Sequence, residues 1–230
     1  MKTSPIRIID TTEPWVPRFL DVVAVTFVTS LLVSNLAAQK LFQLGPATFT
    51  AGILVFPISY IFGDVLTEVY GFRRARRVII MGLLANLFMS AVLWISIRLP
   101  PATGWNLQRE FEAIYSLIPR IVLGSIVGYY FGEISNSWVL SRMKILTQGR
   151  FLWLRTVSST IVGQLVDTIL FVLVAFAAIL PNRLLVSAVL SAWLFKVLYE
   201  FCVTPLTYLI VGKLKALEGV DHFDAKRKDH

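Results

Sequence analysis

The stretch from Thr156 to Leu180 constrains the fold most, because it is an apolar run long enough to cross a bilayer yet carries a charge near its middle. One face of a helix here would carry four residues at i, i+4, i+7 and i+11: Thr160, Gln164, Asp167 and Phe171. A charge near the bilayer centre costs roughly 2.5 kcal/mol or more. Asp167 is therefore expected to face protein or water and is a candidate functional residue; a packing hydrogen bond is the plainer alternative.

The composition is that of a membrane protein, since 56% of the 230 residues are hydrophobic and only 16% are charged, against about a quarter in soluble domains. We predict an all-α fold, a compact bundle of six transmembrane helices over residues 18–212. A lead-in (1–17) and a polar tail (213–230) would flank it, leaving no room for a separate soluble enzyme domain. The six predicted spans are 18–39, 48–69, 77–98, 117–141, 156–180 and 184–212.

The basic residues predict the orientation of these spans. The net charge is +8, but the positive charges lie mostly in short loops, which favours a membrane topology signal over nucleic-acid binding. Sixteen of the 22 lysines and arginines fall in 1–18, 73–77, 142–155 and 213–228, which alternate spans would place on one side, and five fall on the other. By the positive-inside rule, we expect a multi-pass membrane protein with both termini in the cytoplasm.

Other features narrow the chemistry. The two histidines, His222 and His230, lie in the tail, which excludes reactions that need an intramembrane histidine, and we expect no metal and no cofactor.

Gly124, Gly128 and Gly132 follow at four-residue spacing. Such a stripe lets another helix approach closely, either within the chain or across a homodimer.

Lys196 is the expected partner of Asp167. Each lies about 12 residues from one end of its span, hence ~18 Å deep, and a short connection around Pro181 makes the two spans antiparallel neighbours. The two charges can thus meet and offset each other's desolvation cost. A pair between Lys196 and Glu200, one turn apart, is the alternative.

The remaining polar residues in the spans suggest a binding site for a flat, polar heterocycle. Carboxylates accept hydrogen bonds from ring N–H groups, whereas amide and ammonium groups donate to ring carbonyls and nitrogens. The candidate hydrogen-bonding residues are Asn35, Gln39, Asp64, Glu133, Gln164, Asp167, Lys196 and Glu200. The candidate stacking residues are Tyr60, Phe171, Trp193 and Tyr199.

Four runs of sequence resemble the queuosine-precursor transporters, also called the vitamin-uptake-transporter family. They are Ser34–Gln39, Phe56–Thr67, Ser159–Thr168 and Phe195–Leu198. The resemblance implies a six-helix inner-membrane protein, similar to the membrane subunits of energy-coupling-factor importers. It would import 7-deazaguanine bases, chiefly 7-cyano-7-deazaguanine, for salvage into modified tRNA. The family positions are Asn35, Gln39, Asp64, Arg120, Gln164, Asp167 and Lys196, and we add Tyr60, Glu133 and Glu200 as substrate-binding residues.

Two other functions stay open at this stage. The chain could be a binding subunit that needs an energising partner, or an intramembrane hydrolase with a pair such as Ser159 and Lys196. No Walker motif is present, which excludes direct use of ATP. Proton coupling and facilitated diffusion with metabolic trapping are the candidate driving forces.

Overall fold

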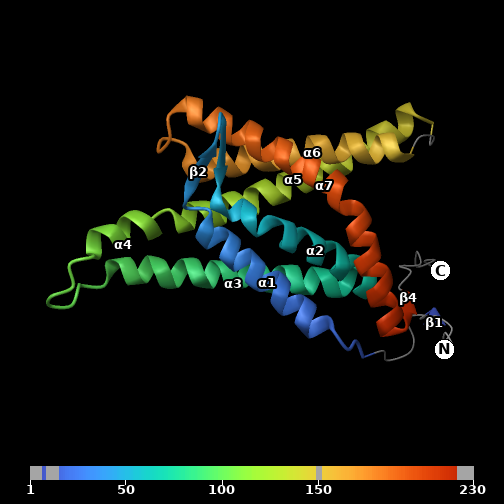
Figure 1. Ribbon diagram of the computed structural model, residues 1–230, viewed down its shortest axis with the longest axis horizontal. Helices are drawn as coiled ribbons and strands as arrows, with labels where there is room; N and C mark the ends of the chain where they lie inside the picture. Colours follow the sequence, from blue (N-terminus) through green and yellow to red (C-terminus); the bar gives the residue numbers. More distant parts are fainter. Residues whose placement is uncertain (1–6, 9–15, 149–151, 222–230) are drawn as a thin grey trace, which may run out of the picture.

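Helices form nearly all of the computed structural model, which describes residues 7–8, 16–148 and 152–221 (Figure 1). The α-helices are α1 (Leu20–Ala37), α2 (Phe56–Tyr70), α3 (Phe72–Arg98), α4 (Gln108–Tyr115), α5 (Ile118–Leu146), α6 (Leu152–Phe176) and α7 (Asn182–Glu218). Strands β2 (Leu41–Leu44) and β3 (Ala47–Thr50) pair antiparallel and lead into a 3-10 turn, η1 (Ala51–Leu54). Strand β1 (Arg7–Ile8) pairs parallel with β4 (Val220–Asp221). The predicted helical membrane fold is confirmed.

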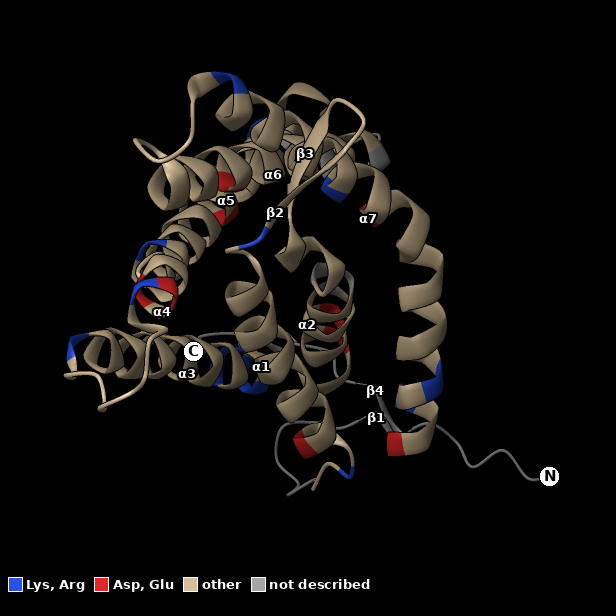
Figure 2. Cartoon of the chain, turned by 60° about the vertical axis from the view of Figure 1, so that its left-hand side comes forward, with Lys and Arg blue, Asp and Glu red and all other residues tan. Residues whose placement is uncertain are grey.

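Within the described residues, five helical segments are long and apolar enough to cross a membrane. They are α1, most of α3, the run Gln108–Met143, most of α6, and α7. Their outer faces are apolar and unpacked; Phe88, on α3, is 73% exposed. Figure 2 shows long stretches of α1 and α3 without a charged residue. These are surfaces for lipid rather than for water.

The predicted span 48–69 is not one continuous helix. Its first residues form β3 and η1, and only α2 is helical. At 15 residues, α2 is about 22 Å long, which is shorter than a hydrocarbon core of about 30 Å. A Gly45–Pro46 turn joins the two strands, and Pro57 stands in the first turn of α2, where a proline is tolerated. The six-span count is thus not confirmed: the described residues hold five long apolar segments and the shorter helix α2.

The predicted span 184–212 is also too short, because α7 continues to Glu218 into the predicted tail. Its 37 residues make it about 55 Å long, and it bends visibly along its course (Figure 1). Pro205 lies inside the helix and lacks the N–H that would bond the carbonyl one turn earlier, which is a sufficient cause for the bend.

Two separate buried clusters hold the helices together, and α7 contributes to both. The first cluster joins α1, α2 and α3 with the second half of α7 through Val211. The second joins α5 and α6 with the first half of α7 through Leu185 and Ala188. The part of α7 between Ala188 and Val211 therefore crosses from one core to the other.

The described loops lie at two ends of the molecule. Figure 1 shows β1, β4, the α2–α3 joint, the last turns of α5 and the first turns of α6 on the right. The β2–β3 hairpin, the α3–α4 loop and the α6–α7 connection lie toward the left. Arg7, in β1, and the arginines of 73–77, at the start of α3, thus lie at the same end.

Glu218 fastens three helices at that end. Its carboxylate accepts hydrogen bonds from the backbone N–H groups of Arg18 and Phe19 and from the Tyr70 hydroxyl, each at 2.9 Å. The first N–H groups of a helix have no partner within it, so an acceptor at the start of α1 is favourable. Sequence reasoning missed this contact because it assigned Glu218 to a polar tail.

We predict that Glu218→Ala lowers the unfolding free energy by about 2 kcal/mol, because three donors lose a buried acceptor. Thermal unfolding of the purified protein in detergent measures the effect. Glu68→Ala is the matched control, since its carboxylate is 64% exposed and lies 3.7 Å from Lys215, an arrangement worth about 0–1 kcal/mol. Equal losses in the two variants would contradict the fastening role.

Candidate functional site

An ion pair between α6 and α7 forms the centre of the candidate site. Lys196 Nζ donates to Asp167 Oδ2 at 2.5 Å. The Lys196 side chain is 14% exposed and the Asp167 side chain is 24% exposed, so the pair is mostly buried. The short connection from α6 to α7 makes the helices neighbours, and the predicted contact is confirmed. Along α7, Lys196 lies between the two buried cores.

Helix α5 packs against the backbone that carries Asp167. A Cβ added at Gly128 would lie 2.7 Å from the Asp167 carbonyl oxygen and 2.8 Å from its Oδ1. One added at Gly132 would lie 2.8 Å from Asp167 Cβ, and Gly124 meets the Phe171 carbonyl in the same way. The stripe therefore makes an intramolecular contact with α6. Because α6 covers this face, the stripe is not free to form the homodimer that was its alternative interpretation.

Two further contacts fix α7 around Lys196. The Trp193 indole N–H donates to the Ile161 carbonyl at 3.1 Å, which ties α7 to α6. On the hairpin side, Thr48 N–H donates to Ser191 Oγ at 3.2 Å. Trp193, predicted as a stacking residue, thus uses its polar atom to brace the two helices. The hairpin contact has no counterpart in the sequence prediction.

Asn35 belongs to a buried polar network rather than to the ion pair. Its Nδ2 donates to Asn86 Oδ1 at 2.6 Å, and Ser125 Oγ donates to its Oδ1 at 2.9 Å. Asn86 in turn donates to the Gly82 carbonyl at 2.9 Å. The network joins α1, α3 and α5, and such a connected set specifies how helices pack in an apolar interior. Asn86 and Ser125 were missed, although both are polar residues within apolar runs.

Arg120 is likewise distant from the ion pair. Its Nε donates to the Val174 carbonyl at 3.1 Å and its Nη2 to the Ala177 carbonyl at 2.8 Å. These carbonyls belong to the last turn and exit of α6, where helix partners are missing. They lie seven and ten residues after Asp167, about 10–15 Å along the helix. The geometry gives Arg120 a role in holding α6.

Gln39 presents an acceptor that the described residues leave unpaired. Its Nε2 donates to the Leu36 carbonyl at 3.1 Å, whereas its Oε1 is buried and has no hydrogen-bond partner in the described part of the protein. Buried polar atoms without partners are uncommon and mark places where a ligand or water donor fits.

The other predicted residues divide by their position. Gln164 and Glu200 are half-buried and lie about one turn from Asp167 and Lys196, so they share the region of the ion pair. Asp64, on α2, and Glu133, on α5, are exposed. The side chain of Tyr60 lies outside the described residues.

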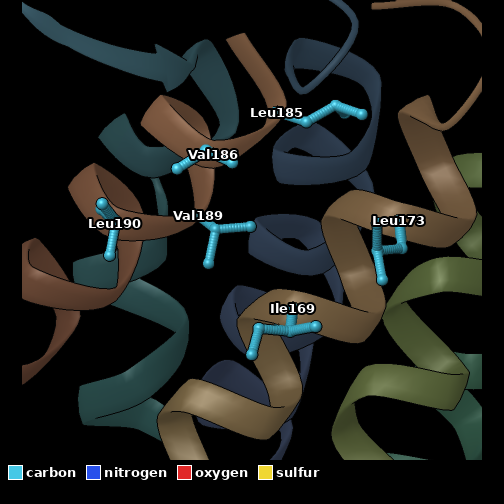
Figure 3. A pocket seen from close by; sticks show the side chains of 6 residues that line it. All are labelled: Ile169, Leu173, Leu185, Val186, Val189 and Leu190. Atoms are coloured by element: carbon cyan, nitrogen blue, oxygen red, sulfur yellow. The ribbon is translucent and has the colours of Figure 1, made fainter. Parts of the chain in front are cut away.

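The pocket shown in Figure 3 does not suit a polar heterocycle. It lies between α6 and α7, has a volume of about 230 Å³, and is lined by aliphatic side chains alone: Ile169, Leu173, Leu185, Val186, Val189 and Leu190. Such a lining offers no hydrogen bond to a ring edge. Among the residues that the structure describes, no cluster of three or more histidine, cysteine, aspartate or glutamate side chains could hold a metal ion.

Comparisons with known proteins place these features in a family. The family described as putative vitamin uptake transporter matches residues 50–210. A probable queuosine precursor transporter of Bacillus subtilis is 31% identical over 176 residues, covering 76% of this chain and 77% of that protein. The queuosine precursor transporter of Escherichia coli is 28% identical over 127 residues, 55% of each chain. No solved structure matches the chain.

We predict that Gly128→Ala impairs both stability and ligand binding, because the new methyl group would push α6 and the Asp167 carboxylate away from their present positions. Gly212→Ala is the control, since a Cβ there meets nothing within 4 Å and replaces a helical glycine at a gain of about 0.5–1 kcal/mol. Thermal unfolding and a binding titration measure the two effects. If the Gly128→Ala protein unfolds at the same temperature as the wild type and binds the ligand equally well, the close α5–α6 contact is contradicted.

Proposed function

Because this chain belongs to the putative vitamin uptake transporter family, which includes queuosine precursor transporters, we propose that it imports 7-deazaguanine bases, chiefly 7-cyano-7-deazaguanine, across the bacterial inner membrane. The imported base would be salvaged into the modified nucleoside of tRNA. The Asp167–Lys196 pair, held in a membrane helix bundle and still partly exposed, carries the proposal.

The chemistry of the pair complements the edge of such a base. A 7-deazaguanine ring has amino and imino N–H donors next to a carbonyl acceptor. A carboxylate can accept from the first two, and an ammonium or amide N–H can donate to the third. Asp167, Lys196 and Gln164 supply these groups from two adjacent helices. A ligand without the matching groups would leave buried partners unpaired, which is the basis of strong discrimination.

The ion pair also compensates both charges when no ligand is bound. Without a ligand, each charge is neutralised by the other, so neither is stranded in the low-dielectric interior. When the base binds, its polar edge can take over part of these hydrogen bonds. The site can therefore be vacant or occupied without an uncompensated charge, which a transporter needs in each cycle.

Around this centre we propose that Gln39, Asp64 and Glu200 extend the substrate path, with Tyr60 and Glu133 as further candidates. Gln39 Oε1 offers a buried acceptor, and Glu200 lies one turn from Lys196. Asn35 and Arg120 would instead position α1 and α6, as their hydrogen bonds indicate.

The membrane orientation is part of the proposal. The end that holds β1, β4 and the α2–α3 joint, with the arginines of 73–77, would face the cytoplasm. The hairpin end would then face the outside. A reporter fused after His230 should be active in the cytoplasm, and a periplasmic reading would reverse this orientation.

The alternative functions receive less support. Lys196 contacts Asp167, which lies eight residues and about 12 Å along α6 from Ser159. This separation disfavours a Ser–Lys hydrolytic pair. A binding subunit that depends on an energising partner is tested by uptake into liposomes that contain the purified protein alone. Uptake without a partner supports a complete transporter.

We predict that Asp167→Asn and Lys196→Ala each abolish salvage of 7-cyano-7-deazaguanine by cells that cannot make it, scored as queuosine in tRNA. The first variant keeps the shape but loses the charge, and the second strands a carboxylate at a cost of several kcal/mol. Glu200→Gln should be milder, because this residue supplements the pair.

A double variant separates folding from binding. Asp167→Leu combined with Lys196→Met removes both charges, so the protein should reach the membrane in normal amounts and still fail to transport. Normal salvage by Asp167→Asn at native expression would remove this residue, and the site built on it, from the mechanism. Direct titration with the cyano, aminomethyl and queuine bases would rank the substrates.

A further inference from the structure

A row of four aromatic rings runs from the hairpin to the helix that carries Lys196. Phe42 on β2 stacks on Phe49 on β3, with ring centroids 5.6 Å apart and planes 29° apart. Phe49 meets Phe195 on α7 edge-on at 6.2 Å. Phe195 stacks on Tyr199 at 6.0 Å with an interplanar angle of 15°. We call these residues the aromatic row.

The hairpin end of this row is fixed in place. The Thr48 backbone donates to Ser191 Oγ at 3.2 Å, and Ser187 Oγ is 3.0 Å from both the Pro46 carbonyl and the Thr48 hydroxyl. These bonds attach both the turn and β3 to α7. Phe49, the next residue, is therefore held against Phe195 by backbone geometry and does not depend on ring contacts alone.

The row lies outside the two buried cores. All four rings are half-buried, and none belongs to either buried cluster. Phe195 and Tyr199 are one turn apart and form a strip on α7. Lys196 and Glu200 form the adjacent strip, displaced by one residue. A flat ligand whose edge meets Lys196 thus has aromatic faces within reach on the same helix.

We propose that Phe195 and Tyr199, backed by Phe49, form the stacking wall of the substrate site, and that this wall selects a fused, flat ring. The inference rests on the proposed function and deepens it. The ion pair would recognise the polar edge of the base through hydrogen bonds. The wall would contact the face of the base and so favour a large, planar ring system. Base–aromatic stacking depends on the π-face rather than on apolar volume. The specificity for a bicyclic base would then come from the wall.

The test compares two ligands that share the same polar edge. One is 7-cyano-7-deazaguanine, and the other is isocytosine, a single ring with the amino, imino and carbonyl groups in the same order. We expect Phe195→Leu to weaken binding of the bicyclic base about tenfold and to change isocytosine binding little. Phe195→Tyr should bind both ligands as the wild type does, because it restores a π-face.

Two controls keep the result interpretable. Phe88→Leu removes an exposed aromatic ring far from the row in sequence and should leave both affinities unchanged. Thermal unfolding of each variant shows whether the fold is retained. Should Phe195→Leu lose affinity for both ligands equally, or Phe195→Tyr fail to restore binding, the residue supports the fold only and the wall is disproved. Wild-type affinity of Phe195→Leu for the bicyclic base disproves it too.

The same experiment separates this inference from the proposed function. A wild-type protein that binds neither ligand contradicts deazaguanine transport itself, and the wall loses its ligand with it. A wild-type protein that binds the bicyclic base while the Phe195→Leu protein binds it equally well contradicts the wall alone.

Discussion

The contact between Asp167 and Lys196 is the interaction on which the arrangement of α5, α6 and α7 depends. Either charge alone would be costly in the bilayer interior, and together they are stable only at hydrogen-bonding distance. The short α6–α7 connection brings the two helices together, and the glycines of α5 let a third helix lie directly against the Asp167 backbone. The Asp167 side of the pair thus lies directly against the backbone of α5, and both side chains are mostly buried.

Polar contacts elsewhere in the chain follow the same pattern of joining different elements. The Asn35 network joins α1, α3 and α5, Arg120 joins α5 to the end of α6, and Glu218 joins α1, α2 and α7. Apolar packing between helices gains little in lipid, because the tails are as apolar as the side chains. Hydrogen bonds and close backbone contacts therefore define the register. The two apolar cores fill the space that these contacts leave.

The sequence predicted those features whose cause is local or set by depth. The ion pair followed from helix rise and a short connection, and the glycine contact followed from four-residue spacing. Features that depend on distant partners were not predictable in this way. Phe42 and Phe49 flank a Gly–Pro turn, which is a hairpin signal, but the apolar residues after it resembled the start of a span. The structural role of Glu218 depends on hydrogen bonds from Arg18 and Phe19 at the start of α1, about 200 residues earlier. Arg120 was predicted as a substrate-binding residue from the family resemblance, and its hydrogen bonds to two carbonyls of α6 and its exit were not predictable from local sequence.

The position of α7 in both cores has a consequence for biogenesis. Helix α7 is synthesised after α1–α6, yet the first core needs Val211 and the second needs Leu185 and Ala188. Until α7 enters the membrane, both clusters are incomplete and Asp167 lacks its counter-ion. Helix α7 therefore completes two cores, the Asp167–Lys196 ion pair and the Glu218 hydrogen bonds together, and the earlier helices lack all of these contacts until it is in place. A truncation within α7 would expose that state to membrane proteases as a whole, rather than removing a single contact.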